Sequence, residues 1–258
     1  MEVTVGSLFS GIGGLDLGLE RAGMKVIWQS EIDKYCCKIL KKHWPEVPNH
    51  GNIKEIKWQE IQRPNIIAGG YPCQPFSQAG KRKGTQDPRH LWPWVREAIS
   101  QLRPDYAILE NVPGHLTMGG TEVIGALTEI GYDAEWRVVS AAGLGANHLR
   151  KRIIIVAHPN CGRCQERQSE TEPISGSCRS GQQNNLAHTI CKRTQIPIER
   201  IFTGIQKSEC PTWWQVEPDV GRVAHGVPSR VDRLRGLGNA VVPQVAEYIG
   251  RLVMEQYN

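Results

Sequence analysis

The residues Glu2-Val3-Thr4-Val5 run into the turn Phe9-Ser10-Gly11-Ile12-Gly13-Gly14, after which Gly14–Ala22 carries leucines at positions 15, 17 and 19. The apolar start predicts a strand, and the leucine spacing predicts a helix. Glycines between the two let the backbone turn tightly and bring its amide groups close to a ligand. Many nucleotide-binding folds use such a turn, so this stretch indicates a fold class before it indicates a function.

The same alternation of strand and helix continues outward from this turn. We expect strands at 25–28, 65–68, 106–109, 134–140 and 152–157, and helices at 34–42, 92–102 and 121–130. This order predicts an α/β fold with a mostly parallel sheet and helices on both of its faces. Ligands of such sheets bind at the carboxyl ends of the strands, where the least ordinary stretches of this sequence fall.

Composition agrees with a globular protein of 258 residues, 40% hydrophobic and 22% charged. No apolar run approaches the roughly 20 residues that cross a bilayer, and no signal peptide is recognisable, so we expect eight reduced cysteines in a cytoplasm. Residues 147–210 hold ten of the 31 basic residues but five of the 26 acidic ones, which leaves 21 of each elsewhere. The net charge of +5 therefore resides in one segment. Such a segment can contact a phosphate backbone, or it can be an ordinary solvated loop.

The most distinctive motif is Gly69-Gly70-Tyr71-Pro72-Cys73-Gln74-Pro75. Glycine and proline on both sides of Cys73 argue against the buried structural position that a free cysteine usually has. Lys81, Arg82 and Lys83 follow closely and can contact phosphates and favour a thiolate. We therefore predict that Cys73 is a nucleophile.

Two acids and two arginines accompany it. Glu31 ends the second predicted strand, where a carboxylate can accept hydrogen bonds from ribose hydroxyls, and Glu110 ends a later strand beside apolar residues, which favours a raised pKa. Arg150 and Arg152 precede the strand 152–157, and alternation would direct them to one side. Taken singly, each of these four residues also fits an ordinary surface position.

In order and spacing these motifs resemble the C5-cytosine-specific DNA methyltransferases of bacterial or phage type. Pro72-Cys73-Gln74 followed by Glu110-Asn111-Val112 is a specific pair, and Gly238-Asn239-Ala240-Val241-Val242-Pro243 resembles the last motif of that family. The resemblance implies a Rossmann-like, S-adenosylmethionine-dependent lobe at 1–157, a small irregular target-recognition lobe at 158–229, and a segment 230–258 that returns to the first lobe. We expect this last segment to open a helix at Gly238–Pro243 that runs through Val253.

The resemblance also implies a site. Cys73 would attack C6 of a flipped-out cytosine, Glu110 would act at N3, and Arg150 and Arg152 would hold the nucleotide. Gln74, Ser77, Lys81, Arg82 and Lys83 would contact DNA. The cofactor S-adenosylmethionine, which leaves as S-adenosylhomocysteine, would contact Phe9, Gly11, Gly13, Gly14, Glu31, Ile32, Asn52, Ile53, Gly70, Leu91, Asn239 and Ala240. The pattern departs from the family at Asn52, where an Asp is usual, and at His148, where a Gln is usual.

The expected enzyme is a DNA (cytosine-5-)-methyltransferase that acts as a monomer on double-stranded DNA, without a metal or a membrane. A restriction endonuclease acting on the same site, not physically bound, would be its counterpart. Three alternatives stay open: the same chemistry on transfer RNA, a nicotinamide oxidoreductase suggested by the glycine turn alone, and a DNA-binding protein without catalysis. His158, Cys161 and Cys164 could be imagined as zinc ligands, but a second close pair of ligands is missing.

Overall fold

A computed structural model describes residues 2–72, 91–117, 119–160 and 230–257. In these ranges one sheet has the strand order β2-β1-β3-β4-β6-β5. Pairing is parallel from β2 through β4, and β6 is antiparallel to both of its neighbours. The predicted mostly parallel α/β sheet is confirmed. The strands are β1 (Thr4–Leu8), β2 (Lys25–Ser30), β3 (Ile66–Gly70), β4 (Tyr106–Asn111), β5 (Tyr132–Ser140) and β6 (Lys151–Pro159).

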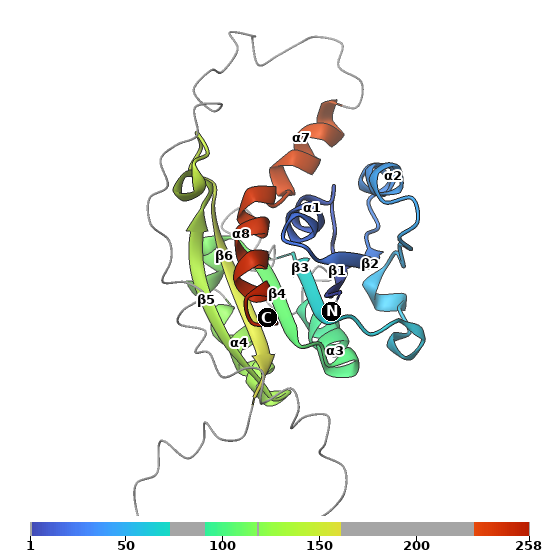
Figure 1. The fold of residues 1–258 in the computed structure, drawn as a ribbon, viewed down its shortest axis with the longest axis vertical. Coiled ribbons are helices and arrows are strands. Elements are labelled where there is room, and N and C mark those ends of the chain that lie inside the picture. Colours follow the sequence, from blue (N-terminus) through green and yellow to red (C-terminus); the bar gives the residue numbers. More distant parts are fainter. Residues whose placement is uncertain (1, 73–90, 118, 161–229, 258) are drawn as a thin grey trace, which may run out of the picture.

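Helices cover both faces of this sheet, as predicted. On one face lie α1 (Gly14–Arg21) and α8 (Pro243–Met254), and on the other lie α3 (Trp92–Leu102) and α4 (Gly120–Glu129) (Figure 1). Each face has its own hydrophobic core, one around Val5, Leu19 and Ile249, the other around Trp28, Ile99 and Leu127. A further helix, α2 (Lys34–His43), follows β2, and the short 3-10 helices η1 (Ile53–Glu55) and η2 (Trp58–Glu60) precede β3.

The pairing of α1 with α8 depends on small residues at the contact. A Cβ atom on Gly18 would lie 2.3 Å from the Cβ of Ala246 and 2.4 Å from the carbonyl oxygen of Pro243. Such distances are shorter than atoms tolerate, so glycine at position 18 sets how closely the two helices approach. The C-terminal segment is thereby held against the helix that follows the glycine turn.

The end of the chain corrects one prediction. A single helix opening at Gly238 is wrong, because the structure has α7 (Arg230–Asn239), then Ala240–Val242 outside any helix, then α8. Pro243 explains the break: it has no N–H to donate, and it disfavours the helical conformation of Val242, whose ψ is 120°. Proline at the first turn of α8 is in turn compatible with starting a helix there.

The predicted lobe boundary at 157/158 falls inside a strand, because β6 continues to Pro159. Residues 161–229, which make up nearly all of the predicted target-recognition lobe, lie outside the described residues. Within the described ranges, no helix combines the length and the apolar character needed to cross a membrane.

Candidate active site

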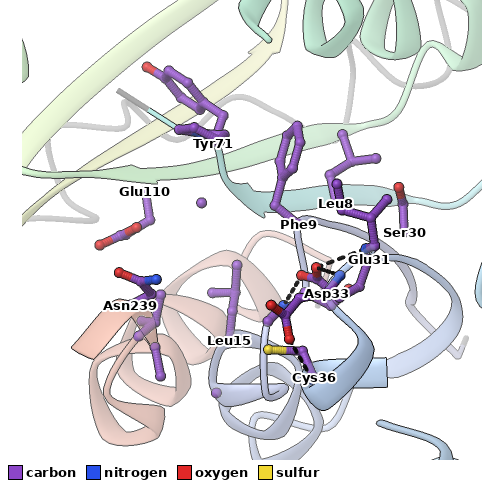
Figure 2. Close-up of a pocket in the computed structure, with 18 of the residues that line it drawn as sticks. Leu8, Phe9, Leu15, Ser30, Glu31, Asp33, Cys36, Tyr71, Glu110 and Asn239 are labelled. Atoms are coloured by element: carbon purple, nitrogen blue, oxygen red, sulfur yellow. Dashed lines mark hydrogen bonds between the residues drawn. The ribbon is translucent and has the colours of Figure 1, made fainter. Parts of the chain in front are cut away.

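A cavity of about 620 Å³ opens at the carboxyl ends of the parallel strands. One part of its wall is formed by the turn after β1, the start of α2 and the segment before η1. The rest is formed by the ends of β3 and β4 and by residues 232–241, which comprise most of α7 and the two residues after it. Figure 2 shows Glu110 and Asn239 near one side of this space and Glu31 and Asp33 near another, with Phe9 between them. Residues from distant parts of the sequence therefore meet here.

All residues predicted to contact the cofactor line this cavity, with the exception of Gly13. Gly13 is the N-cap of α1 and has a φ of 82°, and a Cβ on it would come 2.4 Å from the Trp44 ring. It therefore faces α2, and it lines a neighbouring hollow on the far side of the turn. Glycine is required at this position for the backbone conformation and for the packing of Trp44.

Glu31 holds together two backbone segments of the wall. Its Oε2 atom accepts a hydrogen bond from the amide of Gly11 at 2.8 Å. Its Oε1 atom accepts from the amides of Ile32 at 2.8 Å and Asp33 at 2.7 Å. A carboxylate offers about four acceptor positions, so three bonds leave room for one further donor such as a sugar hydroxyl.

The Asn52 side chain forms hydrogen bonds within the turn that follows it. Its Oδ1 atom caps η1 by accepting from the amide of Lys54 at 3.2 Å, and its Nδ2 donates to Glu55 at 2.8 Å. The residue lines the cavity while its side chain organises the next turn. One lone pair of its carbonyl group and one N–H stay available for a ligand by this count.

Glu110 is the candidate acid of the site. It is 7% exposed at the end of β4 and lines the cavity, and its Oε1 lies 2.7 Å from Nε of Arg152. The two meet because β4 and β6 pair with Glu110 opposite Ile154, and Arg152 is two residues away on the same face. Burial raises the pKa of Glu110, while Arg152 and Arg150 act to lower it. A buried carboxyl with a raised pKa can hold a proton and donate it to a ligand atom.

Arg150 and Arg152 both line the neighbouring hollow, and Arg152 also lines the cavity. Arg150 has a φ of 28°. Its guanidinium donates to the carbonyl oxygens of Leu237 at 3.4 Å and Gly238 at 2.8 Å, and to that of Ala240. The carbonyls of Leu237 and Gly238 belong to the C-terminal end of α7, where a cation is stabilising, and that of Ala240 follows directly after the helix. Arg150 thus fixes the segment that supplies Asn239 and Ala240 to the cavity.

The segment that leads to Cys73 is anchored at Tyr71. Nδ2 of Asn111 donates to the Tyr71 carbonyl at 3.2 Å, and the Tyr71 hydroxyl lies 2.7 Å from Nε2 of His115. Pro72 follows and lines the cavity. Cys73 comes next, but it lies outside the described residues together with Gln74, Ser77, Lys81, Arg82 and Lys83.

The two cysteines in the described ranges are poor candidates for a nucleophile. Burial raises the pKa of Cys36, which lines the cavity, to about 12, and it also raises that of Cys37. Both therefore stay protonated near neutral pH. No group of three or more His, Cys, Asp or Glu side chains within the described ranges could hold a metal ion.

Sequence reasoning missed several residues of the wall. Asp33 caps α2 and forms a 3.5 Å ion pair with Arg235 of α7, which joins the two sides of the cavity. The Asp-to-Tyr-Cys spacing is a helix N-cap signal that was available in the sequence. Arg235 gave no such signal, because its helix was not predicted.

Comparison with known proteins shows the family of the chain. A model of the C-5 cytosine-specific DNA methylase family matches residues 3–198. The chain is 36% identical over 168 residues to type II methyltransferase M.BsuFI of Bacillus subtilis, covering 63% of this chain and 41% of that protein. It is 36% identical over 165 residues to type II methyltransferase M.Eco47II of Escherichia coli, covering 61% and 40%.

Among solved structures, the S. pombe Dnmt2 methyltransferase aligns over 100% of both chains with a TM-score of 0.64 and 17% identity, which shows a shared fold. The chain spans about 40% of the length of the two curated relatives named above. Because the family model covers most of the sequence, the chain belongs to the C-5 cytosine-specific DNA methylase family.

Proposed function

We propose that this chain transfers a methyl group from S-adenosylmethionine to carbon 5 of a cytosine in double-stranded DNA, as part of a restriction-modification system or as a solitary or phage methylase. The observation that carries the proposal is that one cavity brings together a buried acid, Glu110, with a polar pocket around Gly11 and Glu31. The buried acid Glu110 suits a polar heterocycle, and the polar pocket around Gly11 and Glu31 suits a nucleoside. Family membership and the type II methyltransferases among the relatives support the same reaction.

The residues of the wall fit S-adenosylmethionine. Glu31 retains an acceptor position for a ribose hydroxyl, and Phe9, Ile53 and Leu91 offer apolar surface to an adenine ring. Asn239 and Ala240, which Arg150 holds in place, close the opposite side. When bound, this cofactor supplies an electrophilic methyl group on its sulfonium.

The chain's own residues would perform the remaining chemistry. Carbon 5 of cytosine is too weak a nucleophile to take the methyl group unaided. The thiolate of Cys73 would form a bond to C6 and push electron density to C5, while Glu110 donates a proton to N3. After C5 has bonded to the methyl group, loss of its proton restores the C5–C6 double bond and expels the thiolate.

The elements outside the cavity are assigned to DNA. A cytosine within a duplex is unreachable, so it must be flipped into the site. Arg152, which lines the cavity beside Glu110, would contact it. Lys81, Arg82 and Lys83 would contact phosphates, as would basic side chains of a target-recognition lobe at 158–229, which contains seven of the ten basic residues of 147–210.

The test is to express the chain in cells that lack cytosine methylation and to map 5-methylcytosine in both DNA and RNA, beside a Cys73→Ala control. We expect methylated cytosines in one DNA sequence context with the unaltered chain and none with the control. Methylation confined to RNA would contradict the DNA assignment and favour the same chemistry on RNA. Methylation that persists in the control would contradict the assignment of Cys73.

A further inference from the structure

A cluster of buried polar side chains lies directly beneath the glycine turn. Asp16 of α1 is 0% exposed, and its carboxylate accepts hydrogen bonds from Ser7 Oγ of β1 at 2.5 Å and from Gln29 Nε2 of β2 at 2.7 Å. Ser10 of the turn completes the cluster, with its Oγ 2.8 Å from that of Ser7. No Lys, Arg or His of the described ranges forms an ion pair with Asp16.

The ionised carboxylate fixes the direction of these hydrogen bonds. A carboxylate can only accept, so the hydroxyl hydrogen of Ser7 is committed to Asp16. The Ser10 hydroxyl must then donate toward Ser7. The backbone of Ser10 in turn shapes the turn: its carbonyl accepts from the amide of Gly13 at 2.9 Å, and its amide donates to the Ser30 carbonyl at 3.3 Å. The charge of Asp16 therefore orders the turn that forms part of the cavity wall.

Through Gln29 the same carboxylate is connected to a second part of the wall. The backbone amide of Gln29 donates to Pro48 at 2.9 Å, and its carbonyl accepts from His50 at 2.8 Å. The neighbouring Ser30 hydroxyl donates to the Gly51 carbonyl at 2.8 Å. The segment so held leads into Gly51 and Asn52 in the cavity wall. Asp16 is thus, beside Ser30, one of the side chains that tie the turn after β1 to the segment before η1.

The buried charge of Asp16 lowers the stability of the fold. Burial raises the pKa of Asp16 from 3.8 to about 6; Ser7 and Gln29, which face it from the sheet, act to lower it, and Glu20 on its own helix raises it further. Because the folded pKa exceeds the unfolded one, this group destabilises the protein progressively as pH rises from about 4 to about 6, and fully above that. A buried acid that opposes folding at neutral pH is expected where function requires it.

We propose that Asp16 is a positioning residue of the cofactor site, whose carboxylate holds the glycine turn and the segment before η1 at the separation that S-adenosylmethionine requires. This inference rests on the proposed function, because it takes that cofactor as the occupant of the cavity. Asp16 lies behind the wall and acts through Ser7, Ser10 and Gln29. Its loss is expected to weaken cofactor binding and to leave the chemical step largely intact.

The test measures the affinity for S-adenosylhomocysteine by calorimetry between about pH 5 and about pH 8. In the unaltered chain the affinity should fall as the pH drops through about 6, because protonated Asp16 can no longer accept from both neighbours. In Asp16→Asn it should be roughly tenfold weaker at neutral pH and nearly independent of pH, since the loss of one charged hydrogen bond is of this size. The KM for the cofactor should rise by a similar factor, with kcat changed by no more than about twofold.

Glu20→Gln is the matched control, because it removes the same charge one turn along α1 without touching the cluster. Its affinity should stay within about twofold of the unaltered chain at neutral pH, and the midpoint of its pH dependence should move slightly lower. If Asp16→Asn proves unfolded by circular dichroism, Ser10→Ala replaces it. Ser10→Ala removes only the hydroxyl contact between Ser10 and Ser7. It should bind S-adenosylhomocysteine roughly threefold more weakly and keep the pH dependence of the affinity.

Two outcomes would overturn the inference. One is an affinity at neutral pH that neither Asp16→Asn nor, in its place, Ser10→Ala weakens. The other is a pH dependence that persists in Asp16→Asn, which would assign the titration to another group such as Glu110. A failure of the unaltered chain to bind S-adenosylhomocysteine at any pH would instead refute the proposed function itself, so the two failures are distinguishable.

Discussion

At the scale of single residues, Glu110 shows how a buried strand end becomes a chemical site. Its position after an apolar run was enough to predict an acid with a raised pKa from the sequence, and burial does raise the pKa of Glu110. Its ion pair with Arg152 was not predictable, because it follows from the antiparallel pairing of β4 with β6. A strand reversal of this kind is a property of the whole sheet and leaves no mark in either motif.

Replacing the acid by its amide tests its part in the reaction. Glu110→Gln keeps the size of the side chain but cannot donate an acidic proton, so we expect turnover to fall by at least about 100-fold. The affinity for S-adenosylhomocysteine should stay within about threefold, since Glu31 and the glycine turn are unchanged. Glu129→Gln, at an exposed acid of α4, is the control and should retain full turnover. Near-normal turnover of Glu110→Gln would contradict the assignment.

At the scale of elements, the sequence predicted best where a side-chain period meets a buried face. Helices α1 to α4 and all six strands were expected within a few residues of their observed bounds. Helix α7 was missed because its apolar residues do not form a buried stripe: Val231, Leu234 and Leu237 are 77%, 59% and 64% exposed. Hydrophobic periodicity in a sequence predicts a helix only where one side of that helix is buried.

The hydrogen bonds from Arg150 to the end of α7 give a prediction at the scale of elements. Arg150→Ala removes the donor for three carbonyl groups at the end of α7, which should loosen the segment that carries Asn239 and Ala240. We expect affinity for S-adenosylhomocysteine, measured without DNA, to fall roughly tenfold. Lys151→Ala, next to it and exposed, should leave that affinity unchanged. An unaltered affinity in Arg150→Ala would show that Arg150 serves only the nucleotide, as the sequence alone suggested.

The contact between α1 and α8 gives a second prediction at the scale of elements. Gly18→Ala should destabilise the protein by roughly 1–3 kcal/mol, because the added Cβ would collide with Ala246. Gly125→Ala, inside α4 with nothing within 4 Å of the new atom, should stabilise it by up to about 1 kcal/mol through helix propensity. Urea unfolding of the pair measures both values. Equal effects of the two substitutions would contradict the described packing.

At the scale of the whole molecule, the topology explains why four distant motifs form one site. Parallel strands deliver their carboxyl ends to one edge, and the segment after α7 returns to the same edge through the contact of α8 with α1 (Figure 1). Predicting the motifs therefore predicted the cavity. The parts that sequence could not supply, the Asp16 cluster and the placement of Gly13 against Trp44, arise from packing between elements and carry no motif of their own.

The most direct test of the central claim is covalent capture of the chain by DNA that contains 5-fluorocytosine, in the presence of S-adenosylmethionine. Fluorine cannot leave C5 as a proton does, so the bond between Cys73 and C6 should persist and yield a complex stable to denaturing electrophoresis. We expect this complex with the unaltered chain and not with Cys73→Ala or Cys73→Ser, each of which should remain folded. A Cys73→Ser chain that is captured as efficiently as the unaltered one, or an unaltered chain that is not captured at all, would contradict the account.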